Sequence, residues 1–323
     1  MGLLVEGTWE DRWYDTKASE GRFIREESQF RQQIQADGPF KPEAGRYHLY
    51  VSLACPWAHR TMIMRAFKGL QDAIDLSVVH PDMLSQGWQF FGPTLDSSAP
   101  VGDDLANRQY LHQLYTSVQA NYSGRVTVPV LFDRQTGQIV NNESSEILRI
   151  FNQGFDGTGL ANEQHDYYPE PLRQAIDEVN ELVYHQVNNG VYKAGFATSQ
   201  QVYEQEVQSL FAALDQLEQR LTGQEWLVGN QLTEADIRLF TTLVRFDAVY
   251  HGHFKCNWRT LASYANLQSF VERFYALPGV AATTDMVHIK RHYYFSHQQI
   301  NGSQVVPWGP QLPWYQQSLV QIA

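Results

Sequence analysis

The sequence predicts an α/β domain followed by an all-α domain. A strand, a turn and a helix follow one another in residues 47–70, and strand and helix patterns continue to alternate up to about residue 151. A loop rich in Gly, Asn, Asp and Pro occupies residues 152–171, and only long amphipathic helical patterns follow it. Because 323 residues can bury two separate cores, we place the domains at 1–155 and 156–323.

The composition is that of a globular protein. Hydrophobic residues make up 43% and charged residues 18% of the chain, which excludes a disordered protein. The net charge of -11, from 24 basic and 35 acidic residues, argues against nucleic acid or an anionic membrane as the main partner. The N-terminus lacks a signal pattern, and no apolar run approaches the roughly 20 residues that cross a bilayer. We therefore expect a cytoplasmic protein.

Metal and disulfide chemistry have little support. The chain has two cysteines, Cys55 and Cys256, far apart in the sequence, and its 11 histidines form no His-Glu-x-x-His pattern. We expect no metal and assign Cys256 to an inert buried thiol. His59 and Arg60 are expected either to shape a helix surface or to contact the second domain.

The first strand and helix meet at Cys55. Residues 47–53 read as a strand, and Thr61 to Leu70 carry apolar residues at helical spacing, with Pro56 suited to the first helical position. Unpaired N–H groups and the helix dipole favour an anion at this terminus, so we expect the Cys55 thiol to ionise below its free value of about 8.5. Ala58 stands where a dithiol redox protein carries its second cysteine. A disulfide formed by Cys55 must then be resolved by an outside thiol. The alternative is that Cys55 is only a small buried hydrophobe.

The remainder of the first half follows from local patterns. Residues 1–45 are polar and turn-rich and are expected to wrap the first domain. Residues 75–80 predict a second strand, parallel to the first through a right-handed crossover. A long insert over 81–107 carries Trp88, which is either functional or covers an edge of the core. A helix is predicted over about 104–122.

A ligand-binding bend is predicted near Pro129. Residues 124–133 alternate as a strand, but Pro129 removes a ladder hydrogen bond, so we interpret it as a bend, such as a cis peptide bond provides, that frees the main chain of Val128 for a ligand. A hairpin follows at 135–140, and Asn142 to Glu146 open a helix over 147–151. That helix terminus can hold a carboxylate, or its polar residues are only caps.

Helices dominate the second half. The patterns lie over 172–187, 203–221, 233–250 and 263–276, and we assign the Thr233 and Asp236 capping pair to folding. The tail from His288 is aromatic and rich in proline. The order β-α-β, α, β-β-α and then helices is the thioredoxin-like plan followed by an all-α domain.

Six motifs in this order resemble one family. They are Leu53-Ala-Cys55-Pro-Trp-Ala-His-Arg60, Gly87-Trp88, Gly124-Arg-Val-Thr-Val-Pro129, Asn142-Glu-Ser-Ser-Glu146, Asn189-Gly-Val-Tyr192-Lys-Ala-Gly-Phe196 and His288-Ile-Lys-Arg-His-Tyr-Tyr294. The chain resembles the cytosolic glutathione transferases over almost its whole length. More narrowly it resembles the xi class, the glutathionyl-hydroquinone reductases.

The resemblance implies roles for individual residues. Cys55 matches the nucleophile. Tyr192 and one or both of Tyr293 and Tyr294 match tyrosines that line an aromatic substrate pocket, and the choice between the last two stays open. The positions that match glutathione-holding residues are Trp88, Arg125, Val128, Glu143 and Ser144: Val128 through its backbone, Arg125 through its charge, and Glu143 and Ser144 at the γ-glutamyl end.

The implied reaction is reduction of a glutathionyl-hydroquinone, with glutathione as co-substrate and a Cys55–glutathione mixed disulfide as intermediate. A homodimer is expected from the family. One alternative keeps the fold but conjugates glutathione to electrophiles or transfers thiols as omega-like enzymes do. Another is a non-catalytic binding module of the same fold, which predicts no mixed disulfide with glutathione disulfide.

Overall fold

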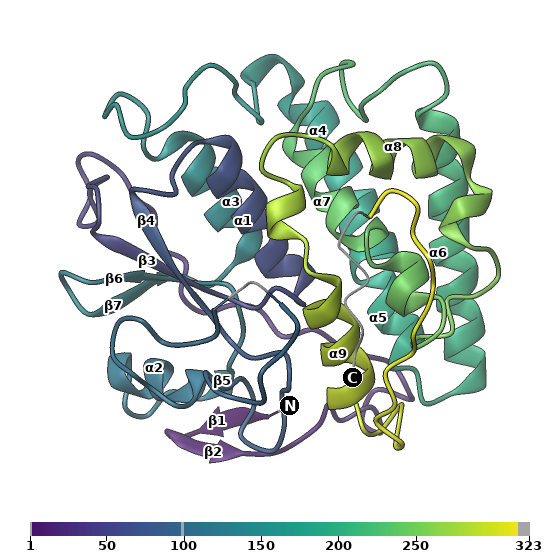
Figure 1. Cartoon of the computed structure of the whole chain (residues 1–323), viewed down its shortest axis with the longest axis horizontal. Coiled ribbons are helices and arrows are strands. Elements are labelled where there is room, and N and C mark those ends of the chain that lie inside the picture. The colour runs from purple at the N-terminus through teal and green to yellow at the C-terminus, as the bar shows by residue number, and fades with distance from the viewer. Residues whose placement is uncertain (1, 98–99, 316–323) are drawn as a thin grey trace.

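A mixed four-stranded sheet forms the core of the first half. The computed structural model describes residues 2–97 and 100–315, with the sheet beside a helical half (Figure 1). The strand order is β4-β3-β6-β7; β3 and β4 are parallel, whereas β6 is antiparallel to both β3 and β7. The parallel pair confirms the predicted β-α-β start. The strands are β3 (Tyr47–Val51), β4 (Ile74–Val78), β6 (Val130–Asp133) and β7 (Gln138–Asn141).

Helix α1 (Pro56–Phe67) connects the two halves of the molecule. It packs against α3 (Ser144–Gln153) in the first half and against α7 (Glu234–Leu243) in the second. Its residues from Pro56 to Met64 are all buried, including His59 and Arg60. Of the two roles expected for His59 and Arg60, contact with the helical half is therefore the correct one: the Arg60 Nη2 donates to Asn188 Oδ1 at 3.1 Å.

The helix predicted over 104–122 is shorter than expected. Helix α2 spans only Leu111–Val118. The carboxylate of Asp103 instead accepts three backbone N–H groups between Leu105 and Arg108, which forms a separate turn. Asn107 within that turn has a φ of 52°, a left-handed conformation that an α-helix does not contain.

The strand predicted over 124–133 divides between two sheets. Its first part, β5 (Gly124–Arg125), pairs with β1 (Leu3–Val5), which also pairs with β2 (Thr8–Glu10), while its second part is β6. The division occurs around the Val128–Pro129 peptide bond, which is cis. The predicted bend at Pro129 is confirmed.

The second half is helical, as predicted. Its helices are α4 (Arg173–Leu182), α5 (Gly190–Gly195), α6 (Gln200–Arg220), α7, α8 (Ala265–Tyr275) and α9 (Met286–Ser296), with π-helical turns at Val183–Asn188 and Phe246–Tyr250. Thr233 and Asp236 form the predicted capping box of α7. The division of the chain at residue 155 stays a prediction.

Helix α9 was missing from the prediction. It begins at Asp285, whose side chain accepts the His288 N–H at 2.8 Å. His288, His292 and Tyr293 are buried together with apolar residues of the same helix. Because polar and apolar residues alike are buried, the sequence lacks the contrast between two faces that identifies an amphipathic helix.

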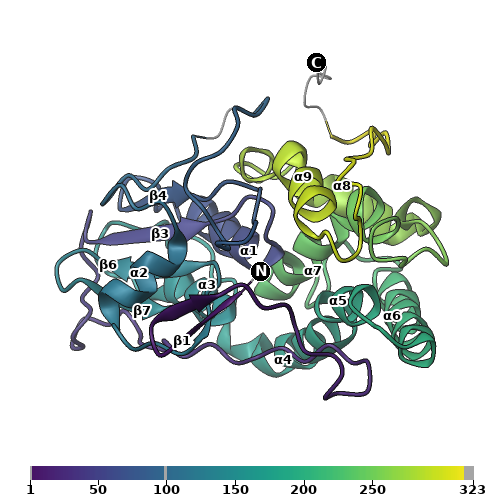
Figure 2. The same cartoon turned by 90° about the horizontal axis from the view of Figure 1, so that it is seen from below.

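The N-terminal segment lies across both halves. Figure 2 shows it running from β1 and β2 toward α4 and α5. Phe30 stacks on Tyr122 in the first half, while Phe23 packs against Tyr192 of α5 and Arg22 forms an ion pair with Glu206 of α6. The segment therefore does more than wrap the first domain.

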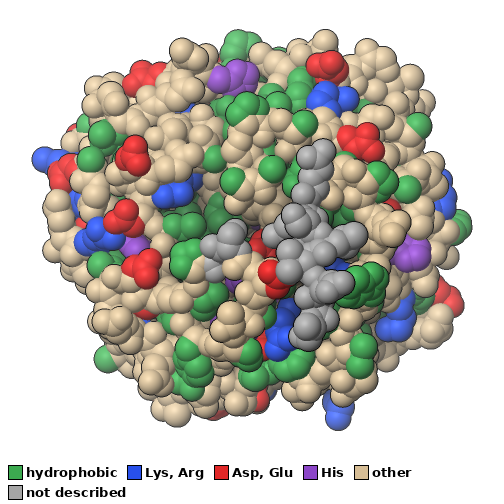
Figure 3. Space-filling view, viewed as in Figure 1, with side chains coloured by type: hydrophobic (Ala, Val, Ile, Leu, Met, Phe, Trp, Pro, Cys, Tyr) green, Lys and Arg blue, Asp and Glu red, His purple; other side chains and the backbone are tan. Residues whose placement is uncertain are grey.

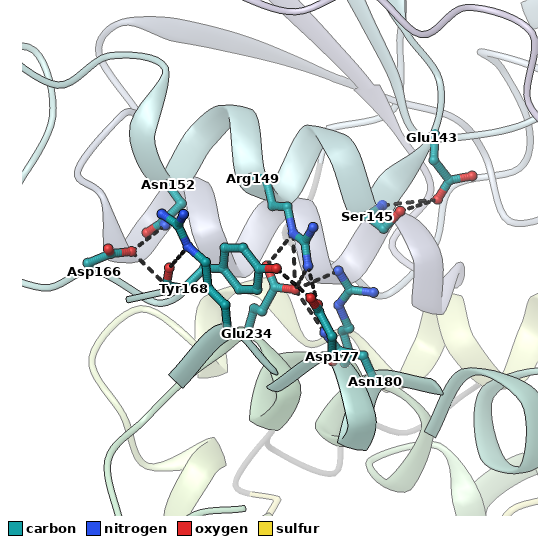
Figure 4. A network of polar contacts seen from close by, with 11 residues as sticks. Glu143, Ser145, Arg149, Asn152, Asp166, Tyr168, Asp177, Asn180 and Glu234 are labelled. Carbon is teal, nitrogen blue, oxygen red and sulfur yellow. Dashed lines mark hydrogen bonds and ion pairs between the residues drawn. The ribbon is translucent and has the colours of Figure 1, made fainter. Parts of the chain in front are cut away.

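A buried carboxylate joins α3 to the helical half (Figure 4). Glu234, at the start of α7, has a fully buried side chain and accepts hydrogen bonds from Arg149 of α3 at 2.9 Å, from Arg238 at 2.7 Å and from Asn180 at 2.9 Å. Arg149 also pairs with Asp177 of α4 at 2.8 Å. The network fixes the position of α3 relative to α4 and α7.

Charges of both signs are interspersed on the face shown in Figure 3. Neither sign gathers into a large patch on that face. Among the described residues, the structure contains no helix with the length and apolar character needed to span a membrane.

Candidate active site

Cys55 lies between β3 and α1, as predicted. It is the N-cap residue of α1, its N–H donates to Ser52 O at 3.1 Å, and Pro56 is the first helical residue. The residue is partly exposed. Its thiol faces the carbonyl oxygen of Val128 at 3.7 Å, so the cis-proline bend and the helix terminus meet at the sulfur.

The expected low pKa of Cys55 is wrong for this structure. Burial raises the pKa of the Cys55 thiol, because protein atoms surround the sulfur closely although the residue has some exposed surface. The backbone N–H groups of Ala58 and Trp57 and the charges of Arg245 and Arg25 lower that pKa without outweighing burial. The helix terminus thus acts as predicted, but the desolvation comes from packing that local sequence does not show.

Val128 keeps its main chain available, as the bend predicted. Within the described residues, no protein group accepts a hydrogen bond from the Val128 N–H. Its side chain is buried. The N–H is therefore free to pair with an extended ligand that reaches the Cys55 sulfur.

Glu143 and Ser144 begin helix α3. The Glu143 carboxylate accepts from the Ser145 N–H at 3.0 Å and from the Ser28 hydroxyl at 3.2 Å. Burial alone would raise the pKa of Glu143, but the bonds from Ser145 and the charges of Arg25 and Arg60 lower it below its usual value. The carboxylate is therefore ionised at neutral pH. Glu143 caps the helix through Oε1, and its Oε2, which accepts from the Ser28 hydroxyl, keeps a further lone pair that can meet an ammonium group.

Trp88 and Arg125 already have protein partners. The Trp88 ring is buried and stacks on His292 with 4.7 Å between centroids. The Arg125 guanidinium donates to Arg12 O at 2.8 Å and pairs with Glu26 at 3.4 Å. Their predicted contacts with a ligand stay predictions.

Arg25 brings a positive charge to the site from the N-terminal segment. Its guanidinium stacks over the Trp57 ring at 4.0 Å, and it forms no ion pair within the described residues. Its charge lowers the pKa of both Cys55 and Glu143, so it lies near the nucleophile and the start of α3. Arg25 was not predicted, because the N-terminal segment has no periodic pattern or motif around it.

Three tyrosine hydroxyls form a chain beside Cys55. Tyr192 of α5 and Tyr293 of α9 are joined by a hydrogen bond of 2.5 Å, and Tyr293 is joined to Tyr250 at 3.0 Å. Charge on Cys55 acts on the pKa of both Tyr192 and Tyr250, so the chain lies near the sulfur. Burial raises the pKa of Tyr250 to about 12 and that of the other two well above their usual value. The three hydroxyls therefore remain proton donors at neutral pH.

Tyr294 lies outside this chain. Its hydroxyl donates to the Ala248 carbonyl at 3.4 Å, and its ring packs on His253. Of the two neighbouring tyrosines, Tyr293 is therefore the one that is hydrogen-bonded to Tyr192, and the choice between them at a substrate stays a prediction. Tyr250 was missed, since it ends a predicted helix and no motif includes it.

Arg245 approaches Cys55 from the helical half. It follows α7, its side chain is fully buried, and it donates to the carbonyls of Leu53 and Ala54. The one cation in the mainly apolar run from Leu239 to Phe246 is the only signal in the sequence that could have indicated a buried partner.

Cys256 lies outside the site, and the described residues contain no candidate metal cluster. Cys256 is buried and near the Val191 carbonyl, and burial raises the pKa of its thiol, in agreement with the predicted inert role. Within residues 2–97 and 100–315, no three side chains of His, Cys, Asp or Glu gather to hold a metal ion. The groups near the Cys55 thiol are neutral phenols and the cations Arg25 and Arg245.

Comparison with known proteins gives consistent matches. The family described as glutathione S-transferase, N-terminal domain, matches residues 54–153, and its C-terminal domain counterpart matches 200–273. The glutathionyl-hydroquinone reductase PcpF of Sphingobium chlorophenolicum is 52% identical over 97% of both chains. The glutathionyl-hydroquinone reductase YqjG of Escherichia coli is 51% identical over 96% of this chain and 95% of its own.

Solved structures agree with these sequence matches. The glutathione-bound structure of YqjG from Escherichia coli K-12 superposes with a TM-score of 0.88 at 47% identity and covers 97% of both chains. The glutathione-S-transferase Xi from Phanerochaete chrysosporium gives a TM-score of 0.86 at 53% identity, over 90% of this chain and 94% of its own.

Proposed function

The chain belongs to the glutathione S-transferase family, and from that premise we propose that it is a xi-class glutathionyl-hydroquinone reductase with glutathione as co-substrate. The observation that carries this function is the placement of a single thiol, Cys55, between the free main chain of Val128 and the tyrosine chain. The thiol suits sulfur exchange, and the phenols suit an aromatic substrate.

In the first step, the Cys55 thiolate attacks the sulfur of the glutathionyl-hydroquinone. A sulfur–sulfur bond forms between Cys55 and glutathione, and the bond between that sulfur and the aromatic carbon breaks with its electron pair on carbon. The carbon takes up a proton, which gives the hydroquinone. Tyr192 is the partly exposed member of the tyrosine chain, and we assign it to bind a phenol oxygen or donate this proton, with Tyr293 and Tyr250 as its support.

In the second step, the thiolate of another glutathione attacks the mixed disulfide. Oxidised glutathione leaves and the Cys55 thiolate returns, so the overall reaction consumes one glutathione and one glutathionyl-hydroquinone. Ala58 in the position of a resolving cysteine, and Cys256 buried in the helical half, leave this step to an outside thiol.

Glutathione binding is assigned along the first half of the molecule. We propose that Val128 pairs with its main chain, while Glu143 and Ser144 hold its γ-glutamyl end at the start of α3. Arg25 supplies the charge that the sequence analysis assigned to Arg125. Trp88 and Arg125 are retained as predicted contacts at the edge of the site.

The alternatives are less well supported. A conjugating transferase uses a hydroxyl to stabilise the glutathione thiolate, whereas this helix terminus presents Cys55. A chlorinated nitrobenzene and a glutathionyl-quinone, compared as substrates, separate these two activities. A non-catalytic module has no need of a nucleophile beside a chain of three phenols.

The direct test is mass spectrometry of two cysteine variants. Cys55→Ser should neither release hydroquinone nor gain the mass of glutathione, while Cys256→Ala should do both as the unmodified protein does. Continued reduction of a glutathionyl-hydroquinone by folded Cys55→Ser would remove Cys55 from the mechanism.

Location and assembly complete the proposal. We propose a cytoplasmic protein, supported by two cysteines that are both free thiols, and a homodimer, supported by the family resemblance. Light scattering at several protein concentrations tests the dimer, and a single-chain mass throughout would exclude it.

A further inference from the structure

Arg245 donates four hydrogen bonds, each to a neutral acceptor. The Nε group donates to Ala54 O at 2.9 Å and Nη2 donates to Leu53 O at 3.0 Å. The Nη1 group donates to Thr241 O at 2.8 Å and to His59 Nδ1 at 2.9 Å. Four of the five N–H groups of the guanidinium are therefore used, and the side chain is fully buried.

This buried cation has no carboxylate partner among the described residues. The ion pairs there use other arginines, including Arg149 and Arg238 with Glu234. A buried charge without a counter-ion carries a large desolvation cost, so its retention points to a role that requires a positive charge. The nearby group that gains a negative charge during the proposed reaction is Cys55, and the Arg245 charge lowers the pKa of its thiol.

His59 holds the guanidinium in orientation. Its Nδ1 accepts from Arg245, so its Nε2 carries the proton and donates to Thr283 Oγ1 at 2.9 Å. Thr283 in turn donates to Val280 O at 2.7 Å. Burial and the adjacent Arg245 charge lower the pKa of His59 far below its usual value, so the ring stays neutral and its tautomer is fixed.

We propose that Arg245 is the positioning residue of the nucleophile: it ties the two carbonyls that precede Cys55 to the helical half and supplies the buried positive charge that balances the Cys55 thiolate. This inference rests on the proposed function. It makes the helical half part of the thiol chemistry, because the reactive turn in the first half is held by a residue that follows α7.

Other groups around the sulfur also influence its ionisation. Arg25 approaches from the N-terminal segment and is exposed, whereas Arg245 is buried and screened less by solvent. Tyr14, Tyr192 and Tyr250 face the same sulfur and remain neutral because burial raises their pKa values. A variant of Arg245 therefore tests the effect of the buried cation on Cys55 ionisation separately from that of Arg25.

The experiment measures the pH dependence of Cys55 alkylation by iodoacetamide, together with kcat/KM for a glutathionyl-hydroquinone, in Cys256→Ala protein. Arg245→Gln removes the charge, and we expect the alkylation profile to move up by about one pH unit and kcat/KM at pH 7 to fall about 100-fold. Arg245→Lys keeps a charge but cannot hold both carbonyls, so its profile should move less while kcat/KM still falls about 10-fold.

Arg149→Lys is the matched control, because Arg149 also joins the two halves but does so through Glu234. It should leave the alkylation profile unchanged. If Arg245→Gln does not fold, Thr283→Val removes the nearer hydroxyl partner of His59 Nε2 at a partly exposed site and leaves only Thr284 Oγ1 at 3.5 Å. This variant should lower kcat several-fold with little change in KM.

An unchanged profile and an unchanged kcat/KM in folded Arg245→Gln overturn the proposal, as does an equal shift in Arg149→Lys. With Arg245→Gln unfolded, an unchanged kcat in Thr283→Val also overturns it. Alkylation requires no quinone substrate. If the unmodified protein fails to reduce glutathionyl-hydroquinones but Arg245→Gln still shifts the alkylation profile, the proposed function is refuted and the role of Arg245 stands.

Discussion

Replacing Tyr293 by Phe removes the hydroxyl that joins Tyr192 to Tyr250. The ring of Tyr293 is buried and contacts Tyr250 and Phe254, so the substitution keeps the packing and deletes one oxygen. Tyr192 then loses its partner at 2.5 Å, and Tyr250 loses its partner at 3.0 Å. The perturbation therefore affects orientation of the donor and little else.

The magnitude follows from the number of bonds lost. Two hydrogen bonds between neutral groups, at about 1 kcal/mol each, correspond to a loss of roughly 30-fold in the first step. Tyr192→Phe removes the proposed donor itself and should cost about 100-fold or more. Tyr294→Phe is the matched control, because its hydroxyl makes only a 3.4 Å bond to Ala248 O, and it should remain within about twofold of the unmodified enzyme.

The assay separates the two steps of the reaction. Single-turnover release of hydroquinone reports the first step, and reduction of a preformed Cys55–glutathione disulfide by glutathione reports the second. The second step needs no proton at carbon, so Tyr293→Phe should leave it unchanged. An equal loss in both steps, or a loss in Tyr294→Phe as large as that in Tyr293→Phe, would refute the reasoning.

Three further predictions follow from the charges. Arg25→Gln should raise KM for glutathione about 10-fold with kcat little changed, whereas Arg22→Gln, three residues earlier, should leave KM unchanged. Steady-state kinetics in which both variants match the unmodified enzyme would exclude Arg25 from glutathione binding. Because burial raises the pKa of Cys55, alkylation of the free enzyme should still increase above pH 9, and a plateau reached near pH 7 would contradict this. Glu234→Gln weakens the charge pairing of the buried Arg238 and should destabilise the fold by about 3 kcal/mol, or roughly 5 °C in Tm. Asp177→Asn, at the half-exposed end of the same network, should cost under about 1 kcal/mol. Equal shifts in Tm by calorimetry would contradict the view that the buried carboxylate stabilises the network most.

Much of the fold could be predicted because its signals are local. Pro56 begins α1 where its missing N–H costs nothing, and the cis bond before Pro129 lies where a strand pattern meets a proline. The capping pair of Thr233 and Asp236 likewise marks the start of α7 within four residues. The elements that were predicted poorly, α2 and α9, depend on contacts outside their own segments, as with the Asp103 turn that shortens α2.

The residues of the candidate site likewise fall into those with a local signal in the sequence and those brought in from distant segments. Local patterns predicted Cys55, the main chain of Val128 and the helix terminus at Glu143, and the family resemblance implied Tyr192. It could not identify the residues that approach from elsewhere: Arg25 from the N-terminal segment, Tyr250 from the end of a helix, and Arg245 from the turn after α7. Nothing near Arg25 or Tyr250 in the sequence distinguishes them from ordinary surface or core positions, and the only signal for Arg245 is its charge among apolar neighbours.

By itself, then, the sequence determined which thiol stands at a helix terminus and which loops surround it, because backbone geometry at a turn depends on neighbours along the chain. Only the tertiary structure decided how closely that thiol is packed, which tyrosines are joined beside it and which cations lie near it. The physical reason is that desolvation and Coulomb interactions depend on distance in space and on the surrounding protein, and the hydrogen bonds that matter here join residues up to 224 positions apart in sequence.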